Sequence, residues 1–336
     1  MNQERFPTPA EAFAPRLKPG KPNYEVWFTV QIHPQTQRAL WLRYMRMLPK
    51  PAAGKTPSHV LWASFFDANA PEKHVYVTCE LPPDFFEAAA AARGAPCVAP
   101  DRVAGSVETA RGELRWDLAF DGQRGVFDPL PKWLTRLPVG GTKDIILEPR
   151  VHSRGTVSLN GEAMSFDGAR GTLHHMWGTK QALEIYWMLI PAFDDDHEGW
   201  SMEIVSVKPD AASPFMAWAV LNGPDGLRSS ASLWRMLRSR CTPDYPNFSF
   251  DIRGADFSVQ VDARMPPGQV TGYRFRDPDG RSLYCEQSDV CAADVVLTDR
   301  GNVRRLKTAR GAAMEFHGIK PWSKVSYLDP YGKLFK

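Results

Sequence analysis

The sequence lacks any long hydrophobic run. No segment of its 336 residues approaches the roughly 18 uninterrupted apolar residues of a membrane-spanning helix. The first 22 residues contain acidic residues and several prolines, but no apolar stretch like that of a secretory leader. We therefore expect a cytoplasmic protein with no transmembrane segment, in which residues 1–22 form an extended N-terminal arm.

Cysteine and an excess of one charge are also scarce. The five cysteines are odd in number, lie far apart and form no C-x-x-C, so neither a zinc site nor a disulfide framework is indicated. The net charge of only +3 argues against a nucleic-acid partner. The G-x-G-x-x-G, Walker A, H-E-x-x-H and G-x-S-x-G motifs are all missing. Nucleotide-dependent, zincin and α/β-hydrolase functions therefore have no support in the sequence.

The residues that are present favour antiparallel sheets. Hydrophobic residues make up 43% of the chain, and β-rich runs alternate with turn signals from 29 prolines and 25 glycines. Residues 24–32 and 38–48 predict a hairpin, and Asn160-Gly161 suits a type I′ turn. Asp277-Pro278-Asp279-Gly280 predicts another turn. Helical candidates are few: residues 85–94 and 229–241, the second of which also suits a strand. Further strands are predicted at 59–67, 73–81, 113–122, 142–151, 184–193, 200–207, 215–222, 248–253, 257–264, 269–277, 282–289 and 292–299.

The length predicts about two domains. Roughly ten short strands in each half would leave exposed edges in one open sheet, so the strands are expected to close into barrels or sandwiches. We place the boundary near residue 185, which gives domains at 23–185 and 186–336.

Side chains able to do chemistry are densest in residues 173–200. In a strand, His175 and Trp177 project from one face and His174 from the other. If the first face lines a barrel lumen, it offers a proton carrier beside a π surface that stabilises a cation. The alternative is a buried tryptophan beside a hydrogen-bonded core histidine. The acidic run 194–198 favours a solvated turn over a metal site, and no metal is predicted.

Several runs of sequence together resemble a known family. The order and spacing of these runs resemble the lipocalin-like superfamily of carotenoid 1,2-hydratases (hydroxyneurosporene synthases), AttH-like proteins and tocopherol-cyclase-like or Diels–Alderase-type pericyclases. The resemblance covers most of residues 24–328. It implies two tandem lipocalin-like antiparallel β-barrel domains with few short helices and an apolar cavity near their junction. It also implies chemistry on polyene or prenyl substrates without a redox cofactor. The runs are YEVWFTVQIHPQTQRALWLRYMRML, LWASFFD, GARGTLHHMWG, YWMLIPAFD, YRFRDPDGRSLYCEQS and GAAMEF.

His175 and Trp177 match the family's H-x-W-G pattern. The hydratases follow it with a tyrosine and an aspartate two residues apart, whereas this chain reads GWSMEIVS there. The nearest acids are Asp194 and Glu203. We predict a cofactor-independent isomerase, cyclase or hydratase of an apolar unsaturated or prenylated molecule. The alternatives are a non-catalytic carrier of such a molecule and a β-sandwich carbohydrate binder or hydrolase. The predicted catalytic residues are His175, Trp177 and Asp194, and the predicted substrate-binding residues are His174, Tyr186, Trp187 and Trp62.

Overall fold

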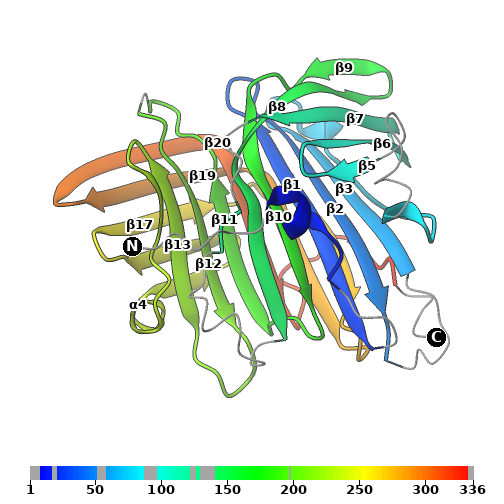
Figure 1. Cartoon of the computed structure of the whole chain (residues 1–336). Helices are drawn as coiled ribbons and strands as arrows, with labels where there is room; N and C mark the ends of the chain where they lie inside the picture. Colours follow the sequence, from blue (N-terminus) through cyan, green and yellow to red (C-terminus); the bar gives the residue numbers. More distant parts are fainter. Residues whose placement is uncertain are drawn as a thin grey trace.

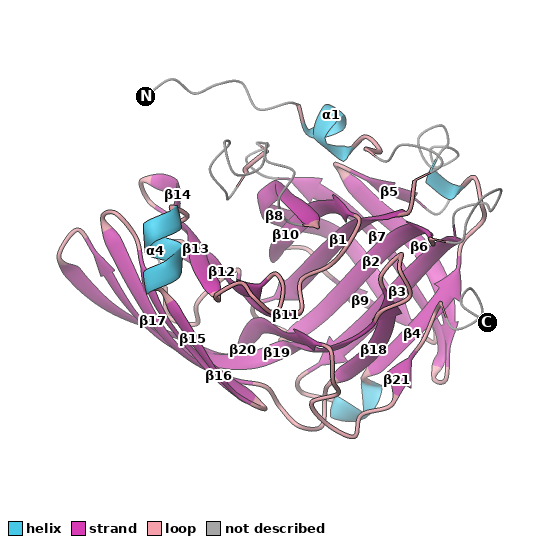
Figure 2. Cartoon of the chain, turned by 90° about the horizontal axis from the view of Figure 1, so that it is seen from below, coloured by secondary structure: helices cyan, strands magenta, loops and turns pink. Residues whose placement is uncertain are grey.

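The chain folds into two curled antiparallel sheets that pack side by side (Figure 1). The computed structural model describes residues 8–16, 21–50, 58–86, 97–121, 126–128, 141–196 and 198–331. Within these ranges helix is confined to short pieces, and a second view shows both sheets curling (Figure 2). The predicted all-β class, with two tandem lipocalin-like domains, is confirmed. No helix in the described ranges is long and apolar enough to cross a membrane.

The first sheet has the strand order β4-β3-β2-β1-β10-β8-β7-β6-β5, with β9 paired to β8. The helix α1 (Pro9–Phe13) precedes it, and a 3-10 turn, η1 (Pro71–Lys73), precedes β4. Its strands are β1 (Asn23–His33), β2 (Arg38–Leu48), β3 (Ser58–Asp67), β4 (Val75–Glu80), β5 (Cys97–Ala99), β6 (Arg102–Thr109), β7 (Gly112–Asp121), β8 (Thr142–Leu159), β9 (Glu162–Ser165) and β10 (Ala169–Gly178).

The second sheet repeats this plan with the order β14-β13-β12-β11-β20-β19-β17-β16-β15. The first strand of each sheet therefore pairs with the last long one, β1 with β10 and β11 with β20. Its elements are β11 (Glu184–Ile190), β12 (Ser201–Lys208), β13 (Met216–Gly223), β14 (Gly226–Ser229), α4 (Leu233–Arg238), β15 (Arg240–Asp244), β16 (Asn247–Arg253), β17 (Phe257–Arg264), β18 (Thr271–Arg276), β19 (Ser282–Asp299), β20 (Asn302–Gly318) and β21 (Tyr327–Leu328).

The local turn signals are confirmed. β1 and β2 form the predicted hairpin from Asn23↔Leu48 to His33↔Arg38. Asn160 and Gly161 both have positive φ, 50° and 81°, between β8 and β9. In the second sheet, the Gly280 N–H donates to the Asp277 carbonyl and closes the turn before β19. Interactions between residues that are close in the sequence therefore determine these turns.

Other elements differ from the sequence expectation. Within the predicted extended arm, Pro9–Phe13 is helical because Thr8 and Glu11 form a capping box. The predicted helix at 229–241 is reduced to α4, because the sheet takes up its two ends as β14 and β15. The predicted strands at 282–289 and 292–299 merge into β19. The helix predicted at 85–94 lies mostly outside the described residues.

Three apolar clusters hold the molecule together. One contains residues from both ends of the first sheet and fills the inside of its curl, and a second does the same in the second sheet. The third joins the domains, packing β1–β3 against β11 and β18–β20. In it, Trp62 stacks on Tyr273 at 4.3 Å between ring centroids, and the Arg43 guanidinium lies 5.0 Å from the Trp62 ring. The domains are therefore joined by an apolar core.

Candidate functional site

A fully buried histidine–glutamate pair lies inside the first domain. His175 Nε2 is 2.8 Å from Glu25 Oε1, and both side chains are 0% exposed. His175 Nδ1 is 2.6 Å from the Ala12 carbonyl oxygen. A carbonyl only accepts, so Nδ1 carries a hydrogen. The remaining contact, between Nε2 and Oε1, therefore holds one further proton that either atom can carry.

The register of β1 against β10 builds this pair. Trp27 lies opposite His175, and Glu25 lies opposite Trp177. Residues two apart share a face of a strand, so all four side chains project inward together. The imidazole stacks on Trp27 at 4.7 Å between ring centroids and 8° between planes, and Trp177 lies 5.0 Å away. The imidazole is thus bordered by two indole rings.

The segment after α1 covers the pair. The Trp27 indole N–H donates to the Phe13 carbonyl at 2.9 Å, and the Arg16 backbone N–H donates to Glu25 Oε1 at 2.6 Å. The Arg16 guanidinium lies 5.1 Å from the Trp177 ring centroid. Glu25 Oε2 is buried with no hydrogen-bond partner among the described residues. The N-terminal segment therefore seals a site that still has one unused acceptor.

His174 lies on the opposite face of β10 and points to the second domain. Its Nδ1 and Nε2 lie 3.2 Å from carboxylate oxygens of Asp144 and Glu203. The second oxygen of Glu203 accepts from the Trp187 indole N–H at 2.7 Å. Burial opposes a charge on His174, but the two carboxylates outweigh it and raise its pKa to about 10. His174 is therefore an imidazolium that links the domains.

The predicted site residues are thus divided among several places. The structure brings His175 and Trp177 together inside the first domain, and places His174, Trp187 and Trp62 between the domains. Tyr186 lies inside the second domain and donates to Glu184 at 2.9 Å. Asp194 accepts from the Ala309 backbone N–H at 2.8 Å and shares none of the contacts of His175. The carboxylate beside His175 is Glu25.

Sequence reasoning did not single out Glu25. The available signal was a lone acid in the otherwise apolar and aromatic run NYEVWF of β1. A charged side chain in such a run is expected to be paired if it is buried. Its partner follows from the pairing of β1 with β10, some 150 residues further along the chain.

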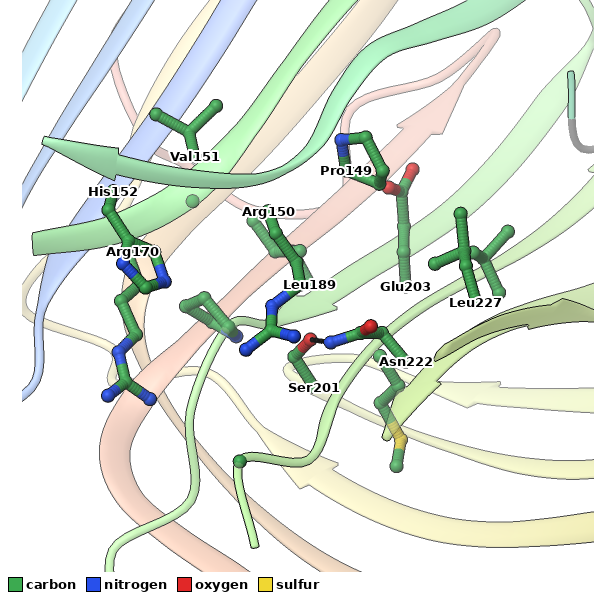
Figure 3. Close-up of a pocket in the computed structure, with 15 residues that line it drawn as sticks. Pro149, Arg150, Val151, His152, Arg170, Leu189, Ser201, Glu203, Asn222 and Leu227 are labelled. Atoms are coloured by element: carbon green, nitrogen blue, oxygen red, sulfur yellow. Dashed lines mark hydrogen bonds between the residues drawn. The ribbon is translucent and has the colours of Figure 1, made fainter. Parts of the chain in front are cut away.

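The junction of the domains contains a cleft (Figure 3). The resemblance implies an apolar cavity there, but the lining is mixed, with Arg150, Arg170, Glu203 and Asn222 beside Leu189. Within the described ranges, no group of three or more His, Cys, Asp or Glu side chains is placed to hold a metal ion. All five cysteines are free thiols.

Comparison with solved structures settles the fold. An AttH-type protein of Nitrosomonas europaea matches with a TM-score of 0.50 and 11% identity, over 95% of this chain and 98% of that one. Kievitone hydratase of Nectria haematococca matches with a TM-score of 0.52 and 11% identity, over 89% of each chain. The chain has the tandem lipocalin-like fold of these proteins. CghA with Sch210972 matches this lipocalin-like chain with a TM-score of 0.51 and 11% identity over 88% of each chain. No protein-family model and no curated protein matches it.

Proposed function

We propose that the chain is a cofactor-independent isomerase, cyclase or hydratase of an apolar, unsaturated small molecule. The observation that carries the proposal is the fully buried His175–Glu25 pair beside Trp27 and Trp177. Protonating a carbon–carbon double bond needs an acid kept away from water and a surface that stabilises the resulting cation. The pair would supply the proton, and the indole faces would supply the surface by cation–π attraction.

The proposed chemistry is balanced within the pair. The proton held between Nε2 and Oε1 adds to one alkene carbon, the π electrons form the new C–H bond, and a carbocation forms at the other carbon. Neutral His175 and a Glu25 carboxylate remain. In a hydratase, water attacks the cation and its surplus proton returns to the pair. In an isomerase or cyclase, a carbon next to the final cation returns the proton. Both routes restore the pair.

Substrate entry would require the segment Ala12–Arg16 to move. This segment occupies His175 Nδ1 and one oxygen of Glu25. The Arg16 guanidinium also covers the Trp177 ring that would face the cation. Once the segment has moved, both polar groups and that ring would be open to a ligand. The free thiols of all five cysteines support the reducing cytoplasm as the proposed compartment.

A hydration assay tests the catalytic proposal. The first compounds to try are kievitone, named in one structural neighbour, and an acyclic carotene, suggested by the sequence resemblance. Solvent extraction and native mass spectrometry of the purified protein would add any ligand that co-purifies. In oxygen-labelled water, wild type should add labelled water to a substrate of the hydratase class. In deuterated water, the product of an isomerase or cyclase should contain deuterium at a carbon atom without having gained water.

Substitutions separate catalysis from binding. His175→Ala should lower turnover by about 100-fold or more, because positioned acid–base groups contribute about 10² to 10⁴. Its ligand complex should persist in native mass spectra. The control is His33→Ala, since His33 is a buried histidine at the far end of β1. Wild-type turnover in His175→Ala would refute the proposal.

The second candidate is a non-catalytic carrier of a hydrophobic molecule. The sealing of His175 by the Ala12 carbonyl favours it, because a histidine with both ring nitrogens bonded can serve structure alone. A carrier predicts no turnover by wild type and a parallel loss of ligand affinity and stability in His175→Ala.

A further inference from the structure

The cleft between the domains is built from the middle of β8, the start of β10 and parts of β11–β14 (Figure 3). It contains residues 149–152 of β8 and Arg170 of β10 on one side. Ser201 and Glu203 of β12 and Asn222 of β13 lie on the other side. His175 is not among its lining residues, so the cleft is separate from the buried pair.

Two unpaired cations face this cleft. In the described part of the chain, no ion pair includes the guanidinium of Arg150 or of Arg170, although most other arginines there are paired with acids. His152 stands beside them, and its pKa is lowered by burial and then by the charges of Arg170 and Arg150. The two guanidinium charges are therefore concentrated at one place, with no counterion among the residues that the structure describes.

The one acid in the lining does not cancel them. One oxygen of Glu203 accepts from Trp187, and the other lies 3.2 Å from His174. His174 carries a positive charge because its pKa is raised to about 10, against the effect of burial, by Glu203 and Asp144. The negative charge of Glu203 is thus balanced by His174 and not by Arg150 or Arg170. The cleft therefore keeps the positive charge of these two arginines.

A free hydroxyl donor adds to the site. The Asn222 amide donates to Ser201 Oγ at 3.1 Å, so the Ser201 hydroxyl hydrogen remains available. Planar guanidinium groups bind carboxylate and phosphate oxygens in pairs of hydrogen bonds. Val220 and Leu227 supply apolar surface next to these donors, because the strand register places them on the same face as Glu203 and Asn222.

We propose that this cleft binds the anionic head group, a carboxylate or a phosphate, of a small amphipathic molecule through Arg150, Arg170 and Ser201. The apolar part of that molecule lies against Val220 and Leu227. The site is independent of the reaction proposed above.

Calorimetric titration of the full chain tests this site with three probes of one tail length: octanoate, octyl phosphate and octanol. At least one anionic probe should bind at least tenfold more tightly than octanol, because charge-assisted hydrogen bonds are absent with octanol. Binding of octanoate alone assigns a carboxylate, and binding of octyl phosphate alone assigns a phosphate. The methyl resonances of Leu227, identified with Leu227→Val, should shift on binding.

Substitutions of Arg150 and Arg170 test whether their positive charges bind the anionic probes. Arg150→Gln with Arg170→Gln should weaken the anionic probe at least tenfold, with each single change giving part of the loss. Both side chains are half-buried and unpaired, so folding should persist, as circular dichroism would verify. The control Arg264→Gln removes an exposed arginine paired with Asp294 and should leave binding unchanged. His175→Ala should also bind normally, which separates this site from the proposed catalysis.

Four results would overturn the site. The first is octanol binding as tightly as both anions, and the second is no binding of any probe. The third is unchanged affinity in the double variant. The fourth is an equal loss in Arg264→Gln.

Discussion

The buried His174 predicts a loss of stability at alkaline pH. Its pKa is raised to about 10 in the folded chain, because the carboxylates of Glu203 and Asp144 outweigh the effect of burial, whereas the ordinary value is 6.5. Between these values the folded chain binds one more proton than the unfolded chain. The free energy of unfolding should therefore fall by about 1.4 kcal/mol per pH unit. This stabilisation is complete below about pH 6.5 and is lost as the pH rises towards about 10.

Urea unfolding followed by tryptophan fluorescence measures this slope. From roughly pH 7 to 8.5, wild type should lose about 2 kcal/mol through His174. The range ends at about pH 8.5 because of the thiols of Cys285 and Cys291, whose pKa is raised by burial in the folded chain. At higher pH these thiols ionise in the unfolded chain first, which lowers the free energy of unfolding further. His33 and His152 have lowered pKa values, so they act below this window.

A pair of variants separates His174 from the background. His174→Gln should be less stable near pH 7 and nearly flat across the same range. The control His152→Gln should keep the wild-type slope, because its lowered pKa leaves it neutral there. If the stability of His174→Gln declined with pH as steeply as that of wild type, the proton would not be held by the ion pairs of His174 with Asp144 and Glu203.

Three further results are expected. Glu25→Ala should destabilise the fold by about 3 to 5 kcal/mol, because it breaks a buried pair. Glu25→Gln should cost only about 1 to 2 kcal/mol while abolishing turnover, and equal stability of the two variants would contradict the pairing. Trp62→Ala should lower urea stability by about 3 to 5 kcal/mol through the cavity left against Tyr273 and Arg43, and a loss below about 1 kcal/mol would contradict tight packing between the domains. Deleting residues 1–16 should expose the Trp27 indole N–H to hydrogen exchange and lower stability by about 3 kcal/mol through three lost hydrogen bonds. Unchanged Trp27 protection, measured by NMR, would show that the segment does not seal the site.

Local patterns predicted much of the fold. The hairpin of β1 and β2, the Asn160-Gly161 turn and most strands follow from alternation and turn chemistry, which depend on neighbouring residues only. β20 was missed because its first half, NVRRLKTARG, is rich in basic residues that face solvent, and only its second half is buried. Its place next to β11 is a long-range pairing that no local pattern reports.

The sequence alone determined that His175 and Trp177 share a face of one strand, because the side-chain period of an extended chain is two. It also determined that His174 projects from the opposite face. Only the tertiary structure decided what each face meets. The register of β1 against β10 put Glu25 and Trp27 beside His175, and the N-terminal segment covered them. The register of β8 against β10 put Asp144 beside His174, and the packing of the domains added Glu203. These partners lie up to 163 residues from the histidines along the chain, so they are fixed by packing and pairing rather than by spacing.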